Sequence, residues 1–562
     1  MLVSGLAAFR GYAQGHRHMT PSSVSQIIEA LFKLIVGLTL AWYLIQILGM
    51  PDYIGAAGAI VGVTISEMAA LLFMAGDFVH TWRLEPANPA DRPDRALSIL
   101  KTCLKLAIPI TLTSSSTSII TAVDNALVLG RLQHAGLLLT EDAARHLMGN
   151  YTGVQTVYQI PAALMVDGVC RLENIPQISD ADMLMTILEH LGAKIRMVNR
   201  NTVEIDCTDV RYTDAPYDLM RRIRASYYLI GAMLGRFGAA KTTMPGGCNF
   251  GVRPIDQHIK GMNALGADVD VRNGFVYAEA TDGRLHGAKI YLDKVSVGAT
   301  MNIILAATMA SGRTIIENAA REPHIVDLAN FLNSMGADVR GAGTDTVKVN
   351  GVDRLHGGSY SIIPDQIEAG TYMAAAGGEV LVKNVIPKHL ECISAKLRET
   401  GTIVQEYEDC VLVKGNGHLR KANVKTLPYP GFPTDMQPQM GALLCMANGT
   451  SVITEGIYDN RFKYVNELRK MGADIQVDGR IAIFEGGAKL TGAPVMACDL
   501  RAGAAMVIAG LCASGKTEIE DIHFIERGYE NFVGKLRKLG ADISIVDYPD
   551  DPELHDKVIS IG

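Results

Sequence analysis

One short phrase recurs six times from residue 170 of this 562-residue chain onward. Each copy has an apolar residue or a threonine, then a glycine, then a small residue, and an aspartate follows in four of the six. The glycines are separated by 74, 70, 65, 71 and 68 residues, and they are Gly192, Gly266, Gly336, Gly401, Gly472 and Gly540. A period of about 70 residues is longer than a solenoid repeat, so it indicates a repeated supersecondary block.

Each block is predicted to alternate strands and helices. The phrase ends an amphipathic segment such as Asn460–Met471, and a β-type run such as Ile475–Val477 follows it. The glycine is then a helix C-cap, because it tolerates the left-handed conformation needed there. A short strand such as Thr314–Glu317 precedes that helix, and a small-residue helix such as Met301–Ala310 precedes the strand.

Six such blocks predict an α/β fold with two lobes of three βαβαββ-type repeats each. We expect helices inside and sheets outside, as a two-domain inside-out α/β barrel, with lobes over residues 167–362 and 363–562. The first block has its strand Cys170–Glu173 and its helix Asp182–Leu191, but Asn150–Met165 stands where the first strand and the small-residue helix belong. The first sheet is therefore expected to lack a strand, and a junction is expected just before residue 167.

Residues 1–166 have a different composition. Three apolar runs with at most one charged residue, Leu34–Met50, Tyr53–Gly76 and Leu106–Val123, have about the length that spans a bilayer. Basic residues flank the first two runs in a pattern that places both flanks in the cytoplasm. A weaker fourth crossing over Leu147–Val166 would return the chain to that side. The segment is thus predicted to be an all-α membrane segment of three or four helices, and the alternative is a set of buried helices in a soluble core.

This N-terminal segment resembles the multidrug/oligosaccharidyl-lipid/polysaccharide exporter superfamily, in particular its stage V sporulation protein B branch. The resemblance is carried by Arg10-Gly11-Tyr12, Gln14-Gly15, Met19-Thr20-Pro21, Ser25-Gln26, Glu29 and the stretch from Ile108-Pro109 to Asp124. Such exporters need a dozen or more helices around a central cavity. A segment of three or four helices is therefore expected to tether the chain to the membrane and not to transport.

The charge balance and the cysteines narrow the class of ligand. With 52 Lys and Arg against 59 Asp and Glu, the net charge is −7, so no nucleic-acid partner is indicated. The nine cysteines form no CxxC pair and no cluster with histidine, which argues against structural zinc and suits a reducing compartment. An anionic ligand must then be bound by local arginines, whose planar guanidinium groups bind carboxylate and phosphate bidentately. Arginines in turns or at helix starts are Arg224, Arg253, Arg461 and Arg501.

The stretch from Met244 to Asp256 is the most informative loop of the chain. It reads Met-Pro-Gly-Gly-Cys-Asn-Phe-Gly-Val-Arg-Pro-Ile-Asp and places Cys248 five residues before Arg253. Glycines allow such a loop to close over a ligand, and the nearby cation favours the thiolate. A buried inert thiol is the alternative for an isolated cysteine, but the loop context favours a functional one.

Residues 167–562 resemble the UDP-N-acetylglucosamine 1-carboxyvinyltransferase family of enolpyruvyl transferases, over nearly all of that family's length except its beginning. The sister family of the shikimate pathway shares the fold but lacks the cysteine loop. The motifs that carry the resemblance are Arg224-Ala225-Ser226, Pro245-Gly246-Gly247-Cys248, Arg253 to His258, Lys294 to Thr300, Arg321-Glu322-Pro323, Ile363-Pro364-Asp365, Phe432 to Gln437, Asn460-Arg461-Phe462 and Asp499 to Ala502.

The resemblance implies a set of roles and no metal or organic cofactor. Asp435 would take the proton of the sugar 3′-hydroxyl, Cys248 would protonate the methylene of phosphoenolpyruvate and react with fosfomycin, and Arg253 and Arg501 would hold the phosphoenolpyruvate anion. The residues implied to line the UDP-sugar site are Arg224, Pro254, Ile255, Asp256, Gln257, Lys294, Ser296, Val297 and Ile457, and Arg461 joins the substrate-binding set. For Asp435, capping of a helix over Met436–Ala447 is the alternative.

One part of the family pattern is missing. The family carries a Lys-Asn pair on its first small-residue helix, where this chain has Gly153-Val154, and no lysine lies between Lys105 and Lys194. The loss of one fixed cation at a developing charge costs orders of magnitude in rate. Two interpretations therefore stay open: a membrane-tethered enolpyruvyl transferase with impaired activity, or a catalytically dead fusion or gene-join artefact that leaves at best a UDP-sugar-binding module.

Overall fold

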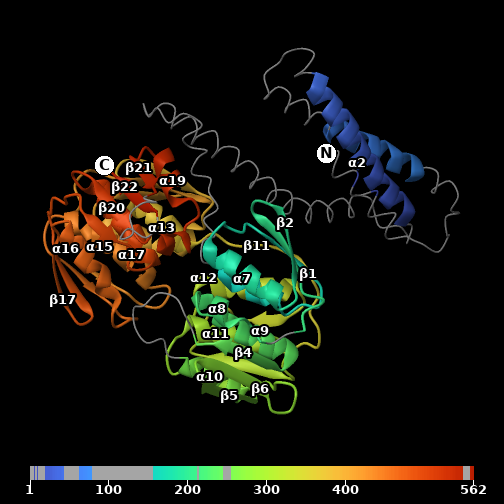
Figure 1. Cartoon of the computed structure of the whole chain (residues 1–562). Helices are drawn as coiled ribbons and strands as arrows, with labels where there is room; N and C mark the ends of the chain where they lie inside the picture. Colours follow the sequence, from blue (N-terminus) through green and yellow to red (C-terminus); the bar gives the residue numbers. More distant parts are fainter. Residues whose placement is uncertain are drawn as a thin grey trace, which may run out of the picture. The chain divides into compact units, whose positions relative to one another are not determined.

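The computed structural model describes residues 6, 9, 19–43, 63–78, 156–211, 214–244, 255–547 and 557–562. The chain divides into two compact units, residues 1–136 and 137–562 (Figure 1). In the first unit, helix α2 (Met19–Trp42) and the helical residues 63–78 are described, and Ala70 and Met74 form a small apolar cluster with Leu6.

The membrane helices predicted for the first unit are not found among the described residues. No helix in the described part of the chain is long and apolar enough to cross a membrane. The predicted runs Leu34–Met50 and Tyr53–Gly76 fall only partly within described residues, and Leu106–Val123 falls outside them.

The second unit is α/β and contains six open sheets, three in each lobe (Figure 1). We name each sheet after the strand that begins its antiparallel part. The first lobe contains the β1 sheet, in the order β11 (Ser359–Ser361), β1 (Val169–Glu173), β3 (Thr202–Asp206), β2 (Lys194–Asn199); the β4 sheet, β4 (Ala239–Thr243), β6 (Phe275–Ala280), β5 (Ala267–Arg272); and the β8 sheet, β7 (Lys289–Tyr291), β8 (Arg313–Glu317), β10 (Thr346–Asn350), β9 (Asp338–Arg340).

The second lobe repeats this organisation. It contains the β12 sheet, in the order β12 (Glu379–Lys383), β14 (Cys410–Lys414), β13 (Ile403–Glu406); the β16 sheet, β15 (Val424–Lys425), β16 (Ser451–Thr454), β18 (Ile481–Glu485), β17 (Asp474–Asp478); and the β20 sheet, β19 (Pro494–Met496), β20 (Thr517–Glu520), β22 (Val558–Ile561), β21 (Ile543–Val546). No sheet within the described residues closes into a barrel.

Helices connect the strands of both lobes. In the first lobe they are α6 (Thr156–Ala163), α7 (Ser179–His190), α8 (Tyr217–Met220), η3 (Arg224–Tyr227), α9 (Tyr228–Phe237), α10 (Asp256–Ala264), α11 (Val297–Thr308) and α12 (Pro323–Ser334). In the second they are α13 (Gln366–Ala374), α14 (Pro387–Glu399), η4 (Thr434–Met436), α15 (Gln437–Met446), η5 (Arg461–Tyr464), α16 (Val465–Lys470), α17 (Leu500–Cys512), α18 (His523–Glu526) and α19 (Phe532–Lys538).

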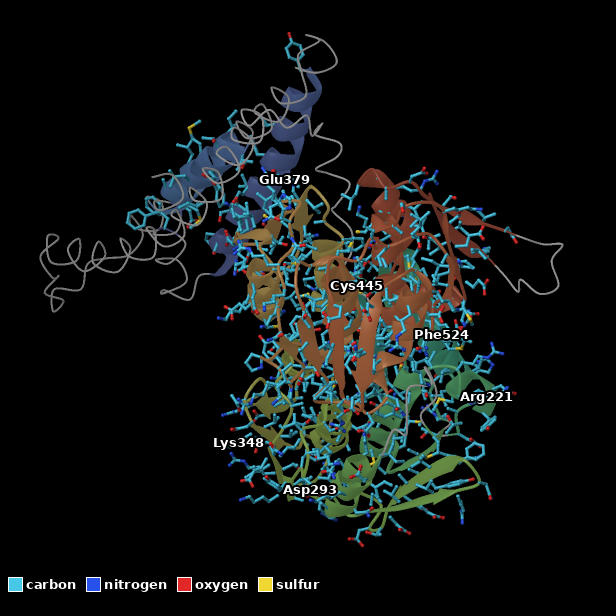
Figure 2. All side chains as sticks on the ribbon, turned by 90° about the vertical axis from the view of Figure 1, so that its left-hand side faces the viewer. Arg221, Asp293, Lys348, Glu379, Cys445 and Phe524 are labelled. Atoms are coloured by element: carbon cyan, nitrogen blue, oxygen red, sulfur yellow. The ribbon has the colours of Figure 1, made fainter. Side chains whose placement is uncertain are left out.

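The small-residue helices form the core of each lobe. Helix α11 is buried at every position from Gly298 to Thr308, and α15, which carries Cys445 (Figure 2), is buried from Gln437 to Cys445. The strands instead alternate buried with exposed positions, as in β1 and β8. A helix that is apolar all round must be covered on every side, so these helices lie inside and the sheets cover them. The apolar core of the first lobe ends at Ile362, and that of the second begins at Ile367.

The recurring glycines end helices as predicted. Each stands one residue after the C-cap of α7, α10, α12, α14, α16 or α19. All six have positive φ, between 86° at Gly266 and 106° at Gly192. The next residue donates its N–H back to the helix, as Ala337 does to the Leu332 carbonyl at 3.1 Å. A side chain at these glycines would be strained, which is why the phrase recurs.

The structure corrects the prediction of an incomplete first sheet. Strand β11, at the end of the first lobe, pairs in parallel with β1 and gives the β1 sheet four strands. The sequence did not indicate this pairing, because the two strands are far apart along the chain.

The prediction of a fourth membrane crossing over Leu147–Val166 is wrong for its described part. Helix α6 and the residues that follow it, up to Val166, belong to the buried apolar core of the first lobe and are almost entirely inaccessible to solvent. Tyr158 stacks on His324 of α12, with ring centroids 4.8 Å apart. The core of the first lobe therefore begins before residue 167, and α6 occupies the place of the small-residue helix of the first block.

Candidate active site

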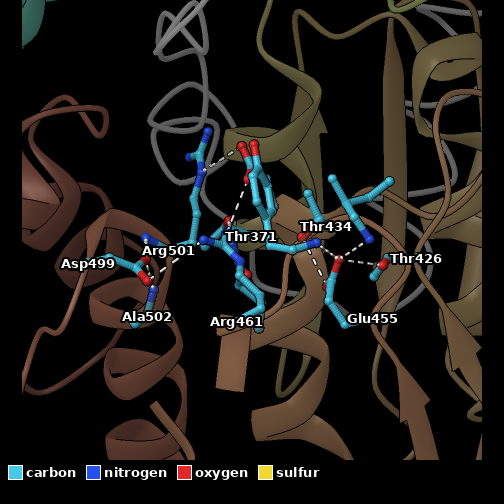
Figure 3. Close-up of polar contacts among 12 residues, drawn as sticks. Thr371, Thr426, Thr434, Glu455, Arg461, Asp499, Arg501 and Ala502 are labelled. Carbon is cyan, nitrogen blue, oxygen red and sulfur yellow. Dashed lines mark hydrogen bonds and ion pairs between the residues drawn. The ribbon is translucent and has the colours of Figure 1, made fainter. Parts of the chain in front are cut away.

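The strongest concentration of buried charge lies around Asp435 in the second lobe, next to Arg461 and Arg501, which are labelled in Figure 3. Its carboxylate Oδ1 accepts a hydrogen bond from Arg461 Nη2 at 3.1 Å, and its Oδ2 is 3.6 Å from Arg501 Nε. The Asp435 side chain is 44% exposed, whereas those of Arg461 and Arg501 are only 1% and 4% exposed. A half-exposed carboxylate thus stands over two buried cations.

Helix starts position both arginines. Arg461 begins η5, and Arg501 is the second residue of α17. Asp499 caps α17 by accepting the N–H groups of Arg501 at 2.8 Å and Ala502 at 2.9 Å, and its Oδ2 is 3.8 Å from Arg461 Nη1. Asp365, which caps α13, lies 3.8 Å from Arg501 Nη2. Acidic caps of two different helices therefore hold the two guanidinium groups.

Both arginines stay cationic despite their burial. Burial lowers the pKa of Arg501, but Tyr529, Asp435 and Asp365 outweigh it and raise the pKa above its ordinary value. The pKa of Arg461 is likewise lowered by burial and raised, on balance, by Asp499 and Asp435. Arg501 Nε and Nη1 have no hydrogen-bond partner among the described residues. Two unsatisfied N–H donors on a buried cation are suited to an anion such as a carboxylate or a phosphate.

A polar layer supports Arg501. Its guanidinium carbon lies 5.3 Å from the centroid of the Tyr529 ring. The Tyr529 hydroxyl is 3.0 Å from Thr371 Oγ1, and Gln439 Nε2 donates to Thr371 at 3.0 Å. These groups are buried and come from α13, α15 and the segment before α19, so they fix the arginine from several helices.

Glu455 organises the other side of the site (Figure 3). Its carboxylate accepts hydrogen bonds from Thr426 Oγ1 at 2.8 Å and Thr434 Oγ1 at 3.0 Å. It also accepts the backbone N–H of Ile457 at 2.8 Å. Thr434 precedes Asp435 in η4, so Glu455 joins the predicted site residue Ile457 to the turn that carries Asp435.

The helix-capping alternative for Asp435 is not what the structure shows. Helix α15 begins at Gln437 with Met436 at its cap, and no side-chain hydrogen bond caps it. The carboxylate of Asp435 instead faces the two arginines.

The predicted sugar-site residues of the first lobe form a second group. Ile255 and Asp256 begin α10, and Gln257 Oε1 accepts the backbone N–H of Asp293 at 2.8 Å (Asp293 is labelled in Figure 2). Lys294 follows and is exposed. Ser296 caps α11, where its hydroxyl accepts the N–H of Ala299 at 3.3 Å, and Val297 is the first residue of that helix.

Other predicted residues fall partly or wholly outside the described residues. Cys248, Arg253 and Pro254 lie in residues 245–254, of which nothing is described. Arg224 begins η3, but its side chain is not described. The described cysteines are all poor thiolates, because burial raises the pKa of each of them above its ordinary value. For Cys170 the pKa is raised to about 11. Within the described residues, no group of three His, Cys, Asp or Glu side chains is placed to hold a metal ion.

The start of α12 connects the first lobe to the Asp435 site. Glu322 Oε1 accepts the backbone N–H of Tyr429 in the second lobe at 3.4 Å. His324 is buried, and neither of its ring nitrogens has a hydrogen-bond partner among the described residues. Burial lowers the pKa of His324 to about 4, against the opposing charge of Asp435. The motif Arg321-Glu322-Pro323 supported only the family resemblance, and this contact gives it a structural role.

Sequence reasoning also missed Asp499, Glu455 and Tyr529 as site residues. For Asp499, a signal was present: an aspartate two residues before an arginine, at the start of a small-residue helix, is a typical N-cap. Glu455 and Tyr529 left no local signal, because their contacts come from residues far away in the sequence.

Two family models match the chain and overlap. The model for EPSP synthase (3-phosphoshikimate 1-carboxyvinyltransferase) matches residues 155–536, and the model for polysaccharide biosynthesis protein matches residues 1–166. Both include residues 155–166, the segment that contains α6.

Curated relatives are similar to the C-terminal part of the chain. A UDP-N-acetylglucosamine 1-carboxyvinyltransferase 3 of Caldanaerobacter subterraneus is 57% identical over 387 residues, which are 68% of this chain and 92% of that protein. A UDP-N-acetylglucosamine 1-carboxyvinyltransferase of Clostridium botulinum is 56% identical over 388 residues, which are 68% of this chain and 93% of that protein.

Solved structures are similar in fold. The crystal structure of the enolpyruvyl transferase NikO from Streptomyces tendae matches with a TM-score of 0.63 at 26% identity, over 69% of this chain and 94% of that one. An EPSP synthase structure from Acinetobacter baumannii matches with a TM-score of 0.53 at 19% identity, over 68% of this chain and 93% of that one, and this likeness concerns the fold alone.

Proposed function

The chain belongs to the UDP-N-acetylglucosamine 1-carboxyvinyltransferase family, and on that premise we propose how its residues carry out the reaction. The reaction is transfer of the enolpyruvyl group from phosphoenolpyruvate to the 3′-hydroxyl of UDP-N-acetylglucosamine, with release of phosphate, the first committed step of peptidoglycan synthesis. Each lobe is an inside-out α/β barrel of three repeats in this proposal.

The proposed chemistry is an addition followed by an elimination. The 3′-oxygen bonds to C2 of phosphoenolpyruvate, Asp435 takes the hydroxyl proton, and Cys248 delivers a proton to the methylene carbon. In the second step a proton leaves the resulting methyl group, the C=C bond forms again and the C–O bond to phosphate breaks. Arg253 and Arg501 hold the anion through both steps.

The pairing of Asp435 with two buried guanidinium groups is the observation that carries this proposal. Arg461 and Arg501 favour the carboxylate form of Asp435, the form that can accept a proton. Arg501 keeps two N–H donors for an incoming anion. The proposed base and Arg501 of the anion site thus lie next to each other in the second lobe, with Asp435 Oδ2 3.6 Å from Arg501 Nε.

The sugar nucleotide is assigned to residues of both lobes. Ile255, Asp256, Gln257, Lys294, Ser296 and Val297 would contact it from the first lobe, together with Arg224 and Pro254, and Ile457 and Arg461 from the second. The fixed position of Asp293 against Gln257 supports a preorganised wall on the first lobe.

The activity of this chain is proposed to be impaired. It has no lysine between Lys105 and Lys194, and α6, which occupies the place of the small-residue helix that carries the Lys-Asn pair in the family, has no charged residue. The resemblance of residues 1–166 to exporters supports a tether that holds the enzyme at the cytoplasmic face of the membrane. A catalytically dead fusion is the alternative, and a complete absence of turnover would favour it.

Phosphate release from phosphoenolpyruvate in the presence of UDP-N-acetylglucosamine tests the assignment. Asp435→Asn preserves the shape of the side chain and is expected to lower the rate by about 10²–10⁴, the usual contribution of a general base. The matched control is Asp459→Asn, because Asp459 is an exposed aspartate that pairs with Arg480 at 2.7 Å at the surface. Equal rates for the Asp435→Asn variant and the unmodified chain would exclude Asp435 as the base.

A further inference from the structure

Among the described residues, four of the six sheets begin with a short lead strand that pairs in parallel, and a fifth has a single parallel bridge in that place. Strands β11, β7, β15 and β19 pair in parallel with β1, β8, β16 and β20. In the β4 sheet, Asp214 makes a parallel bridge to Lys241, the third residue of β4. Among the described residues, β12 alone has no such neighbour.

The lead strands are attached by a repeated set of backbone hydrogen bonds. In the β1 and β8 sheets, the third residue of the following strand donates its N–H to the carbonyl of the residue just before the lead strand. Arg171 donates to Gly358 at 2.8 Å, and Ile315 donates to Ala288 at 2.8 Å. The last residue of the same strand accepts an N–H from the chain just after the lead strand. These acceptor bonds are Ile362 to Glu173 at 3.1 Å, Leu292 to Glu317 at 3.0 Å, Thr426 to Thr454 at 3.0 Å and Ala497 to Glu520 at 3.0 Å.

An asparagine side chain adds a further bond. Asn174 follows β1 with a φ of 67°, and its Nδ2 donates to the Ile362 carbonyl at 2.8 Å. Asn318 follows β8 with a φ of 57°, and its Nδ2 donates to the Leu292 carbonyl at 2.8 Å. Both carbonyls belong to the residue just after the lead strand.

Strand β12 carries the same groups without the partner. Leu381 is its third residue, Lys383 is its last, and Asn384 follows with a φ of 57°. No described residue accepts the Leu381 N–H or donates to the Lys383 C=O in the way that the β1 and β8 sheets show, and Asn384 makes no side-chain hydrogen bond with any described residue. Asn384 is exposed, whereas Asn174 and Asn318 are half-buried.

The lack of a described parallel neighbour for β12 is explained by an exchange of lead strands between the two lobes. Strand β11 leads into α13, the first helix of the second lobe, yet it pairs with β1 of the first lobe. By the same exchange, the strand that leads into α6 would pair with β12. This chain matches 92% of the Caldanaerobacter relative, which leaves about 8% of that protein unmatched. The lead strand of the first block is also missing from the expected place in this chain.

We propose that the outer edge of β12, which begins at Glu379 (Figure 2) and is not paired by any described residue, is a docking site for a short extended segment of a separate polypeptide, added as a parallel fourth strand. Peptides add to exposed sheet edges through main-chain hydrogen bonds, and side-chain pockets supply specificity. In β7 and β19 the middle residues, Ile290 and Val495, are buried between exposed neighbours. The partner therefore has one central apolar residue in an otherwise polar stretch, as the lead strand of a related transferase would have.

The test uses the full chain and a synthetic peptide that copies the N-terminus of the Caldanaerobacter relative up to the counterpart of Thr156. Hydrogen exchange is measured over residues 379–384 and over β8. In the free chain the Leu381 amide should exchange faster than the Ile315 amide, and the peptide should slow the exchange of Leu381 only. A peptide with proline at its central apolar position should not bind.

Asn384→Gly and Asn318→Gly form a matched pair, because glycine adopts the positive φ and removes only the amide. Asn384→Gly should weaken peptide binding about tenfold without changing the melting temperature of the free chain. Asn318→Gly should lower the melting temperature and leave peptide affinity unchanged. The proposal is overturned if Leu381 is already as protected as Ile315, if the peptide does not bind, or if Asn384→Gly binds it equally well. Binding is measured without substrate, so the outcome is independent of the proposed activity.

Discussion

The Asp435 site of the second lobe and the first block of the first lobe differ in how much sequence change they tolerate. At Asp435 every charge has a partner of opposite sign at a defined distance. In the first block, α6 fills its place with apolar residues and directs its buried amide, Gln159, to Asp327. A core accepts another sequence of suitable volume and polarity, whereas a reaction needs particular charges at particular places.

The largest expected effect concerns Arg501. Arg501→Gln removes a buried cation that faces Asp435 and Asp365, so phosphate release should fall by about 10²–10³. The same change leaves Asp365 buried without its counter-charge, which should lower the free energy of unfolding by about 3–5 kcal/mol. Steady-state kinetics and urea unfolding measure the two effects.

Arg480→Gln is the control for Arg501. Arg480 is 46% exposed and pairs with Asp459 at the surface, so its loss should cost about 0–1 kcal/mol and leave turnover unchanged. Similar losses in the two variants would show that the buried network is not special.

The next effect is a pH dependence of the free energy of unfolding. It comes from His324, which stacks on Tyr158 of α6. Its pKa is lowered by burial to about 4, so the unfolded chain binds a proton at this residue more readily than the folded one. The free energy of unfolding is therefore not reduced by His324 above about pH 6.5. It falls by about 3 kcal/mol, because of this residue, as the pH drops from there through 4. His324→Phe keeps the ring stacking and should remove this loss.

The measurement is the free energy of unfolding of the two proteins between pH 4 and pH 7. The difference between them isolates His324 from Asp327, whose pKa is raised by burial to about 6 and which acts in the opposite direction. A difference that is independent of pH would contradict a buried neutral histidine.

A smaller effect is expected at Gln159. Its amide donates to Asp327, which also accepts a hydrogen bond from the Tyr360 hydroxyl at 2.6 Å. Gln159→Met removes one of these two donors from a buried carboxylate and should cost about 1–3 kcal/mol of unfolding free energy. The matched control is Gln476→Met, because Gln476 is exposed on a strand, and it should change the free energy of unfolding by less than about 0.5 kcal/mol. Equal stabilities would mean that α6 is not packed into the first lobe.

Local signals were sufficient for the repeats and for Arg461 and Arg501, which stand in turns or at helix starts, whereas Asp435 was implied by the family resemblance. The glycines predicted to be C-caps have positive φ, and Asp435, Arg461 and Arg501 lie together. The pairing of β11 with β1 and the packing of α6 could not be predicted, because both depend on contacts between residues far apart in the sequence. The apolar residues of α6 fit a membrane segment and a protein core equally well, and only the contacts with α12 decide between them.

The most direct test of the account restores what the first block lacks. Phosphate release is measured for this chain and for a variant in which the segment before Thr156 is replaced by the N-terminus of the Caldanaerobacter relative, with its strand and Lys-Asn pair. If the site of the second lobe is intact and only the cation of the first block is missing, the restored chain should turn over about 10²–10³ times faster. Equal turnover by the two chains would contradict the account.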